Sequence, residues 1–152
     1  MTPKKKQPSD LRIIDNWLST SEFLVLKDIF TSTTCNWFVV NGISDNTETM
    51  KNLNPLDNYM FAHMVYQQYS PSSQYWEKVT EIIHPKLKET CGQDFRVITR
   101  IKCNMYPRTP EVVQHPWHTD SSEIKGMRGL LLSFNTCDGY TGFADGTEAV
   151  SY

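Results

Sequence analysis

A histidine and an aspartate, His118 and Asp120, stand two residues apart in the segment HPWHTD. In extended backbone, side chains alternate between faces, so residues two apart point the same way. An imidazole nitrogen and a carboxylate oxygen on one face are two of the three ligands in the two-histidine, one-carboxylate set that holds non-haem Fe(II) with open positions. The pair therefore predicts a metal site if the chain supplies one more histidine.

His115 is the nearest candidate for that third ligand. It precedes His118 by three residues, an odd offset that puts the two on opposite faces of a strand, and Pro116 bends the path between them. A local set of His115, His118 and Asp120 therefore requires backbone that departs from a strand. The alternative for His115 is an exposed residue, or one that supports the ligands without touching the metal.

The two remaining histidines are His63 and His84. His63 lies in the apolar run MFAHMVY, which predicts a strand over residues 60–66. There it is either a metal ligand or, as is commoner for such residues, a hydrogen-bonded core histidine. His84 precedes Pro85 and is expected at the surface.

Composition limits the classes of protein to consider. With 152 residues, 39% of them hydrophobic, and a net charge of −2, the chain is expected to form one domain with no affinity for nucleic acid or membrane. No run approaches the ~20 apolar residues that span a bilayer. Residues 1–10 are expected to be a flexible leader, and residues 11–152 a single domain. The cysteines form no CxxC pair, so we expect reduced thiols and a cytoplasmic protein.

Helical patterns dominate the first part of the chain. Ser19 and Glu22 fit a capping box that opens a helix ending near Thr31. A second helix is expected from residues 70–73 to Gly92, with a kink or restart at Pro85. A strand over residues 36–40 and a long surface loop over residues 41–58 separate the first helix from the strand at 60–66.

Strand patterns dominate from Phe95 onwards. Alternation and turn signals predict strands over residues 95–106, 117–120, 127–135, 140–143 and from 147 to the end. Helices followed by strands are typical of an α+β fold in which helices cover one side of a mostly antiparallel sheet.

Four short motifs follow one another along the second half of the chain. They are Asn104-Met105-Tyr106-Pro107, then His118-Thr119-Asp120, then the predicted strand Gly129 to Phe134 with its terminal Asn135, and finally Gly139-Tyr140-Thr141-Gly142-Phe143. In this order the chain resembles the Fe(II)- and 2-oxoglutarate-dependent oxygenases, specifically the prolyl-4-hydroxylase-like branch and its phage and metagenomic relatives. The resemblance covers most of the chain.

The resemblance implies a double-stranded β-helix, or jelly-roll, with residues 11–92 as a helical support layer and residues 95–152 as the first half of the β-helix. It implies that His118 and Asp120 bind Fe(II) together with a distal histidine. It also implies that Tyr106 lines the 2-oxoglutarate pocket, where a phenol can donate to a carboxylate. The alternative for Tyr106 is a plain core aromatic residue.

Two departures from the family pattern are visible. Ser133 stands where several relatives carry a tyrosine that reaches 2-oxoglutarate. No histidine follows Asp120 and no arginine or lysine follows Arg128, so the distal ligand and the 2-oxoglutarate anchor are both missing. The resemblance therefore predicts an incomplete β-helix, the front part of an oxygenase.

Two functions follow as expectations. The first is a dioxygenase that uses O₂ and 2-oxoglutarate to hydroxylate a C–H bond, with a peptide or protein side chain as the family-level substrate. The second is a non-catalytic, β-rich binding protein derived from the same fold. In either case an open sheet edge would favour pairing between copies of the chain.

Overall fold

The computed structural model describes residues 11–43, 58–118, 120 and 126–150. The chain forms two compact units, one made of residues 16–42 and 59–108 and the other of residues 1–15, 43–58 and 109–152. The expected leader and nearly all of the expected loop at 41–58 lie outside the described residues. None of the helices in the described part is long and apolar enough to cross a membrane.

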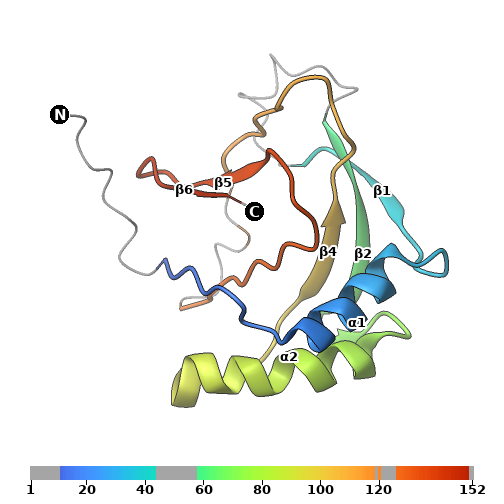
Figure 1. Ribbon diagram of the computed structural model, residues 1–152, viewed down its shortest axis with the longest axis vertical. Helices are drawn as coiled ribbons and strands as arrows, with labels where there is room; N and C mark the ends of the chain where they lie inside the picture. The colour runs from blue at the N-terminus through green and yellow to red at the C-terminus, as the bar shows by residue number, and fades with distance from the viewer. Residues whose placement is uncertain (1–10, 44–57, 119, 121–125, 151–152) are drawn as a thin grey trace. The chain divides into compact units, whose positions relative to one another are not determined.

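The first unit is built on a four-stranded antiparallel sheet. Its strands are β1 (Phe38–Asn41), β2 (Tyr59–Gln67), β3 (Ser70–Pro71) and β4 (Ile101–Met105). Figure 1 shows β2 between β1 and β4, and the short β3 pairs with the last residues of β2. The expectation of a mixed α+β fold with antiparallel strands is therefore confirmed.

The strand β2 is covered on both faces. Met60 and Ala62 are buried, as are His63 and Val65, so buried residues occur at both parities of the strand. Its pairing with β4 shifts register between Met64 and Tyr66. Two-sided burial makes β2 the centre of this unit's core.

Helix α1 (Thr20–Thr31) begins at the predicted capping box. The Ser19 backbone N–H donates to Glu22 Oε2 at 2.7 Å, and the Glu22 N–H donates to Ser19 Oγ at 3.3 Å. These bonds satisfy two backbone donors that the first helical turn leaves without intrahelical acceptors. Leu26 and Phe30, four residues apart, form the buried stripe of the helix.

Helix α2 (Trp76–Cys91) begins later than the expected residues 70–73, because Ser70 and Pro71 form β3. It runs through Pro85 as one element, so of the two expected alternatives, a kink or a restart, the restart is wrong. A helix tolerates proline where its other contacts offset the lost hydrogen bond, and here the preceding turn is anchored by buried Val79, Ile82 and Ile83. The helix ends at Gly92, whose φ of 57° is a conformation that glycine adopts without steric cost. A short 3₁₀ helix, η3 (Gly92–Asp94), follows.

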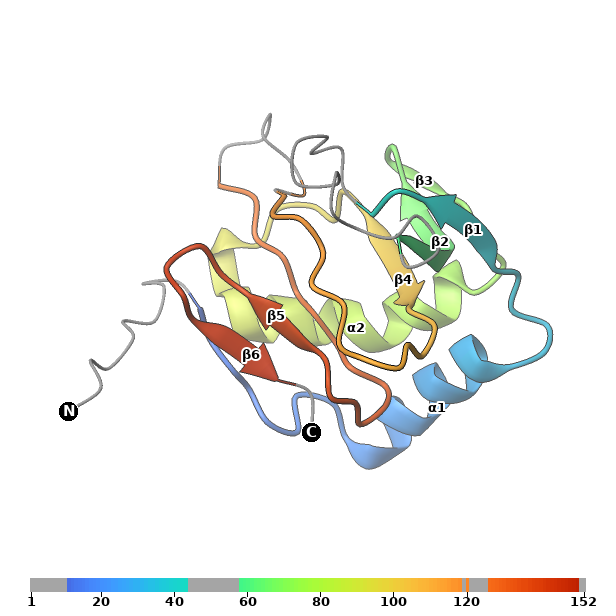
Figure 2. The ribbon, with the colours of Figure 1, turned by 90° about the horizontal axis from the view of Figure 1, so that it is seen from above.

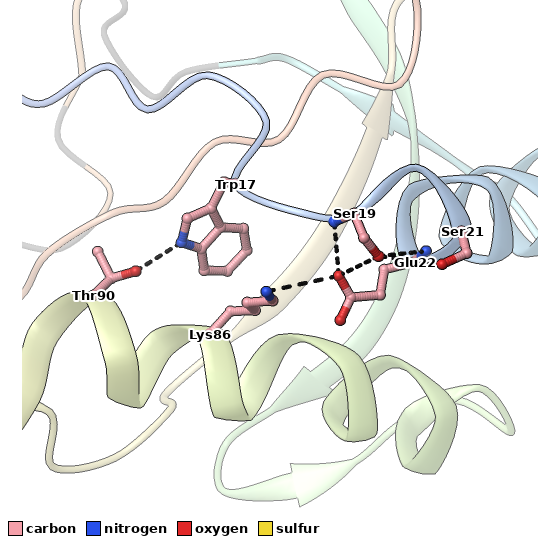
Figure 3. A network of polar contacts seen from close by, with 6 residues as sticks. All are labelled: Trp17, Ser19, Ser21, Glu22, Lys86 and Thr90. Atoms are coloured by element: carbon pink, nitrogen blue, oxygen red, sulfur yellow. Dashed lines mark hydrogen bonds and ion pairs between the residues drawn. The ribbon is translucent and has the colours of Figure 1, made fainter.

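Polar contacts join α1 and the segment before it to α2 (Figure 3). The Trp17 indole N–H donates to Thr90 Oγ1 at 2.7 Å, and Lys86 Nζ lies 3.8 Å from Glu22 Oε2. The Lys86–Glu22 pair is partly exposed and so adds little stability. The Trp17 bond fixes the chain's entry into α1 against the last turn of α2.

The second unit contains an antiparallel hairpin of β5 (Tyr140–Gly142) and β6 (Glu148–Val150), visible in Figure 2. The Phe143 and Gly146 N–H groups donate to the Thr147 and Phe143 carbonyls, and Gly146 has a φ of 84°. A turn at Asp145-Gly146 therefore separates the two strands, as the predicted strands at 140–143 and from 147 onwards require.

Other predicted strands are wrong. Residues 127–135 form no strand, although Leu132 and Phe134 are half-buried while Leu131 and Ser133 are exposed. Alternation of this kind specifies extended backbone, but a strand also needs a hydrogen-bonding partner. Residues 95–100 are likewise not paired as a strand, and the described residues of 117–120 contain none.

Candidate metal site

His118 and Asp120 lie close together, as their two-residue spacing predicted. His118 Nε2 is 3.8 Å from Asp120 Oδ1, and the side chains are 47% and 60% exposed. An exposed pair of this kind contributes little to stability because water screens it.

The separation can be compared with what a metal ion requires. Nitrogen and oxygen ligands lie about 2.0–2.2 Å from a first-row divalent ion, so two of them at right angles are about 3 Å apart. The 3.8 Å between Nε2 and Oδ1 exceeds this by less than 1 Å. Small rotations of two exposed side chains close that difference, so the pair fits as two ligands of one ion.

The ring of His118 has its own orienting contact. Its Nδ1 lies 3.2 Å from the Pro116 carbonyl oxygen. A carbonyl can only accept, so this contact requires a proton on Nδ1, which leaves the Nε2 lone pair available in the neutral ring. A ligating histidine commonly has this arrangement, with one nitrogen held by a carbonyl and the other on the metal.

His115 does not complete the set. Among the described residues, no three histidine, cysteine, aspartate or glutamate side chains come together to hold a metal ion, and His115, His118 and Asp120 are all described. Burial, with a smaller contribution from the charge of His118, lowers the pKa of His115 below its ordinary value of 6.5. His115 is therefore a half-buried neutral imidazole beside the pair rather than a third member of it.

A pocket of about 440 Å³ adjoins His118. Its walls are mainly apolar and come from two segments, Trp117-His118 and Gly142-Phe143-Ala144. A Cβ added at Gly142 would lie 3.2 Å from Trp117 Cη2, so the absence of a side chain there lets the indole lie close to β5.

Sequence reasoning missed the apolar wall of this pocket. Trp117 stands next to His118 in HPWHTD, which is a local signal, but Phe143 and Ala144 follow much later. Only the fold of the second unit brings them beside His118.

The remaining predicted residues belong to the first unit. Tyr106 follows β4 in the first unit and is 50% exposed, so it is no buried core aromatic residue. His63 is buried, with Nδ1 2.6 Å from the Asn36 carbonyl oxygen and Nε2 2.8 Å from Ser73 Oγ. His63 is therefore the hydrogen-bonded core histidine, and both of its nitrogens are engaged. His84 is half-buried against Phe95 rather than fully at the surface.

We compared the chain with protein families, curated proteins and solved structures. No family model matches the chain, and no curated protein and no solved structure matches it.

Proposed function

We propose that this protein is an Fe(II)- and 2-oxoglutarate-dependent oxygenase in which His118 and Asp120 bind the metal. The single observation that supports this is the approach of His118 Nε2 to within 3.8 Å of Asp120 Oδ1, beside an apolar pocket. In this proposal the second unit belongs to a jelly-roll of the prolyl-4-hydroxylase-like kind.

Each residue of the pair has a defined task. Bound Fe(II), with 2-oxoglutarate and O₂, supplies the oxidising chemistry that converts a C–H bond to C–OH while the co-substrate becomes succinate and CO₂. The Pro116 carbonyl holds the His118 ring so that the lone pair of Nε2 is the one that would bind the metal. Asp120 contributes the negative charge, which matches the oxygen-ligand preference of a divalent ion.

The pocket walls have a second task. Trp117 and Phe143 present apolar surface next to His118. Apolar walls can accept the carbon skeleton of a substrate beside the metal ligands. A peptide or protein side chain is the substrate class we assign by family analogy.

A non-catalytic interaction protein is the second candidate, and two observations favour it. The described residues bring no third ligand to the pair. On β1, which in the described part of the chain pairs only with β2, Phe38 and Val39 are 47% and 55% exposed. An exposed apolar edge strand is a surface on which a second copy could pair. Analytical ultracentrifugation over a range of concentrations tests for such pairing.

A titration with Mn(II), an inert substitute for Fe(II), tests the oxygenase proposal. Loss of the free-ion signal in electron paramagnetic resonance reports binding, with and without 2-oxoglutarate. The wild type should bind Mn(II), and binding should tighten when 2-oxoglutarate is added. His118→Ala and Asp120→Asn should each weaken binding by at least about tenfold, since losing even a residue that supports a ligand typically costs 10- to 100-fold.

His84→Ala is the matched control, because His84 contacts Phe95 in the first unit and takes no part in the pair. It should bind Mn(II) as the wild type does. Anaerobic Fe(II) with 2-oxoglutarate should also give the visible absorption band of a chelate. If neither Mn(II) binding nor the band is observed in folded protein, the oxygenase proposal is wrong and the interaction protein is favoured.

A further inference from the structure

His63 occupies an aromatic cage in the first unit. Its ring centroid lies 6.1 Å from that of Phe30, 6.2 Å from Trp37 and 5.8 Å from Tyr75. The residue is only 7% exposed. Such surroundings hold the ring in one orientation, so the hydrogen bonds of its two nitrogens have fixed directions.

The chemistry of its partners determines the tautomer of His63. The Asn36 carbonyl oxygen, 2.6 Å from Nδ1, can only accept, so Nδ1 carries the proton. In the neutral ring Nε2 is then an acceptor, and the Ser73 hydroxyl, 2.8 Å away, must donate to it. The Asn36 carbonyl thus orients the His63 imidazole, and the imidazole accepts a hydrogen bond from the Ser73 hydroxyl.

This Ser–His pair lies on a pocket of about 480 Å³. Polar side chains dominate the remaining lining: Thr34, Asn36, Gln67, Ser72, Gln74 and Tyr75. Ser73 is half-buried, whereas His63 lies beneath it and is nearly inaccessible. The hydroxyl is therefore the member of the pair that a bound molecule would meet.

We propose that Ser73 and His63 form a nucleophile–base pair that hydrolyses small carboxylic esters. Ser73 Oγ attacks the ester carbonyl carbon while its proton passes to His63 Nε2. The bond from that carbon to the leaving oxygen then breaks, and His63 returns the proton to the departing alcohol. Water then attacks the acyl carbon while its proton passes to His63 Nε2, the bond from that carbon to Ser73 Oγ breaks, and His63 returns the proton to Ser73 as the acid leaves. The roles are those of a serine hydrolase, with the Asn36 carbonyl in the orienting position that a carboxylate commonly fills.

The Tyr75 N–H donates to Ser73 Oγ at 3.1 Å and so positions the nucleophile. A donor for the negative charge that develops on the ester carbonyl oxygen must come from elsewhere in the pocket. The hydroxyls of Thr34 and Tyr75 lie 2.9 Å apart, and Thr34 Oγ1 also lies 2.6 Å from Ser32 Oγ. When Ser32 donates to Thr34 and Thr34 donates to Tyr75, the Tyr75 hydroxyl proton is left to donate to the carbonyl oxygen of an ester in the pocket, which is the electrostatic contribution that acyl transfer requires.

Active-site labelling tests the proposal without reference to metal binding. The full chain would be incubated with an alkyl fluorophosphonate in the presence of EDTA, followed by intact-mass measurement and peptide mapping. We expect one added phosphonyl group, located on Ser73. p-Nitrophenyl acetate should be hydrolysed by the same protein, and prior labelling should abolish that hydrolysis.

Ser72 is the matched control, because it lines the same pocket but its hydroxyl contacts the Ser70 carbonyl rather than a histidine. Ser73→Ala should take no label and Ser72→Ala should label normally. A folded His63→Gln variant should label about 100- to 10,000-fold more slowly, the usual effect of removing a general base.

Several results would overturn the proposal. They are no label on the wild type, a label mapped to another residue, or a folded His63→Gln variant that labels at the wild-type rate. Circular dichroism establishes which variants are folded, and the wild-type peptide map decides the question even if Ser73→Ala does not fold.

Discussion

Trp17 and Thr90, 73 residues apart in the chain, are joined by a hydrogen bond of 2.7 Å from the indole N–H to the threonine hydroxyl. Thr90→Val removes the acceptor while keeping the side chain's shape. We expect it to lower the free energy of unfolding by about 0.5–1.5 kcal/mol, the usual net value of one such bond. Urea denaturation measures this, and Thr90→Ser, which keeps the hydroxyl, should lose less. Equal losses in the two variants would mean that the bond contributes nothing.

Leu26 is the most deeply buried residue of α1, at 1% exposure, whereas Leu24 on the same helix is 48% exposed. Leu26→Ala leaves a cavity in the core and should cost about 2–5 kcal/mol. Leu24→Ala makes the same chemical change at the surface and should cost less than about 1 kcal/mol. Urea midpoints for the two variants check the difference, and similar midpoints would contradict the packing of α1.

The capping box makes the stability of α1 depend on pH. The Ser19 hydroxyl and backbone N–H, with a minor contribution from Lys86, lower the pKa of Glu22 below its ordinary value of 4.5. A lowered carboxyl pKa stabilises the fold above the unfolded-state pKa, and this stabilisation disappears as the pH falls through the folded-state value. The stability difference between wild type and Glu22→Gln should therefore be largest at neutral pH and shrink below pH of about 4.5. In a Ser19→Ala background the pH dependence of that difference should weaken, because the main partner of the carboxylate is gone.

Local signals in the sequence predicted α1 and the end of α2, but not the start of α2, which was expected at residues 70–73 and lies at Trp76. Ser19 and Glu22 identify the start of α1, and Gly92 marks the end of α2, because caps involve neighbours within one turn. The paired strands were harder to predict. Residues 127–135 alternate as a strand would, but pairing depends on a partner segment whose position local sequence does not encode.

The candidate metal site also has a part that local sequence predicts and a part that it does not. The two-residue spacing alone predicted that the side chains of His118 and Asp120 lie close together. The pocket wall from Phe143 and Ala144 could not be predicted, because it arises from the folding of a distant hairpin against Trp117. The hydrogen bond between His63 and Ser73 likewise spans ten residues and depends on how β2 meets the segment before α2.

The four cysteines are free thiols in very different surroundings. Burial, with a smaller contribution from Cys35, raises the pKa of Cys103 to about 12. At pH 8 only roughly one Cys103 in ten thousand would then be a thiolate, the reactive form. N-ethylmaleimide should therefore modify exposed Cys137 first in the native protein, and Cys103 and the buried Cys35 last, as followed by peptide mass spectrometry over time. In urea all four should react at similar rates, and native labelling of Cys103 as fast as that of Cys137 would contradict its raised pKa.

Gly142 and Trp117 provide a test of the pocket beside His118. A Cβ at position 142 would lie 3.2 Å from Trp117 Cη2, which is tighter than most contacts, so Gly142→Ala should push the indole outward. The ring is 51% exposed and has room to move, so the cost in stability should be below about 1 kcal/mol. In ¹H–¹⁵N spectra the Trp117 indole signal, assigned with Trp117→Phe, should shift while those of Trp17, Trp37 and Trp76 stay in place. Gly139→Ala is the control, since its Cβ would make only an ordinary 3.5 Å contact with Cys137 Sγ and should leave the Trp117 signal unmoved. An unshifted Trp117 signal in Gly142→Ala would show that the indole does not lie against β5, and the pocket wall would have to be assigned to other residues.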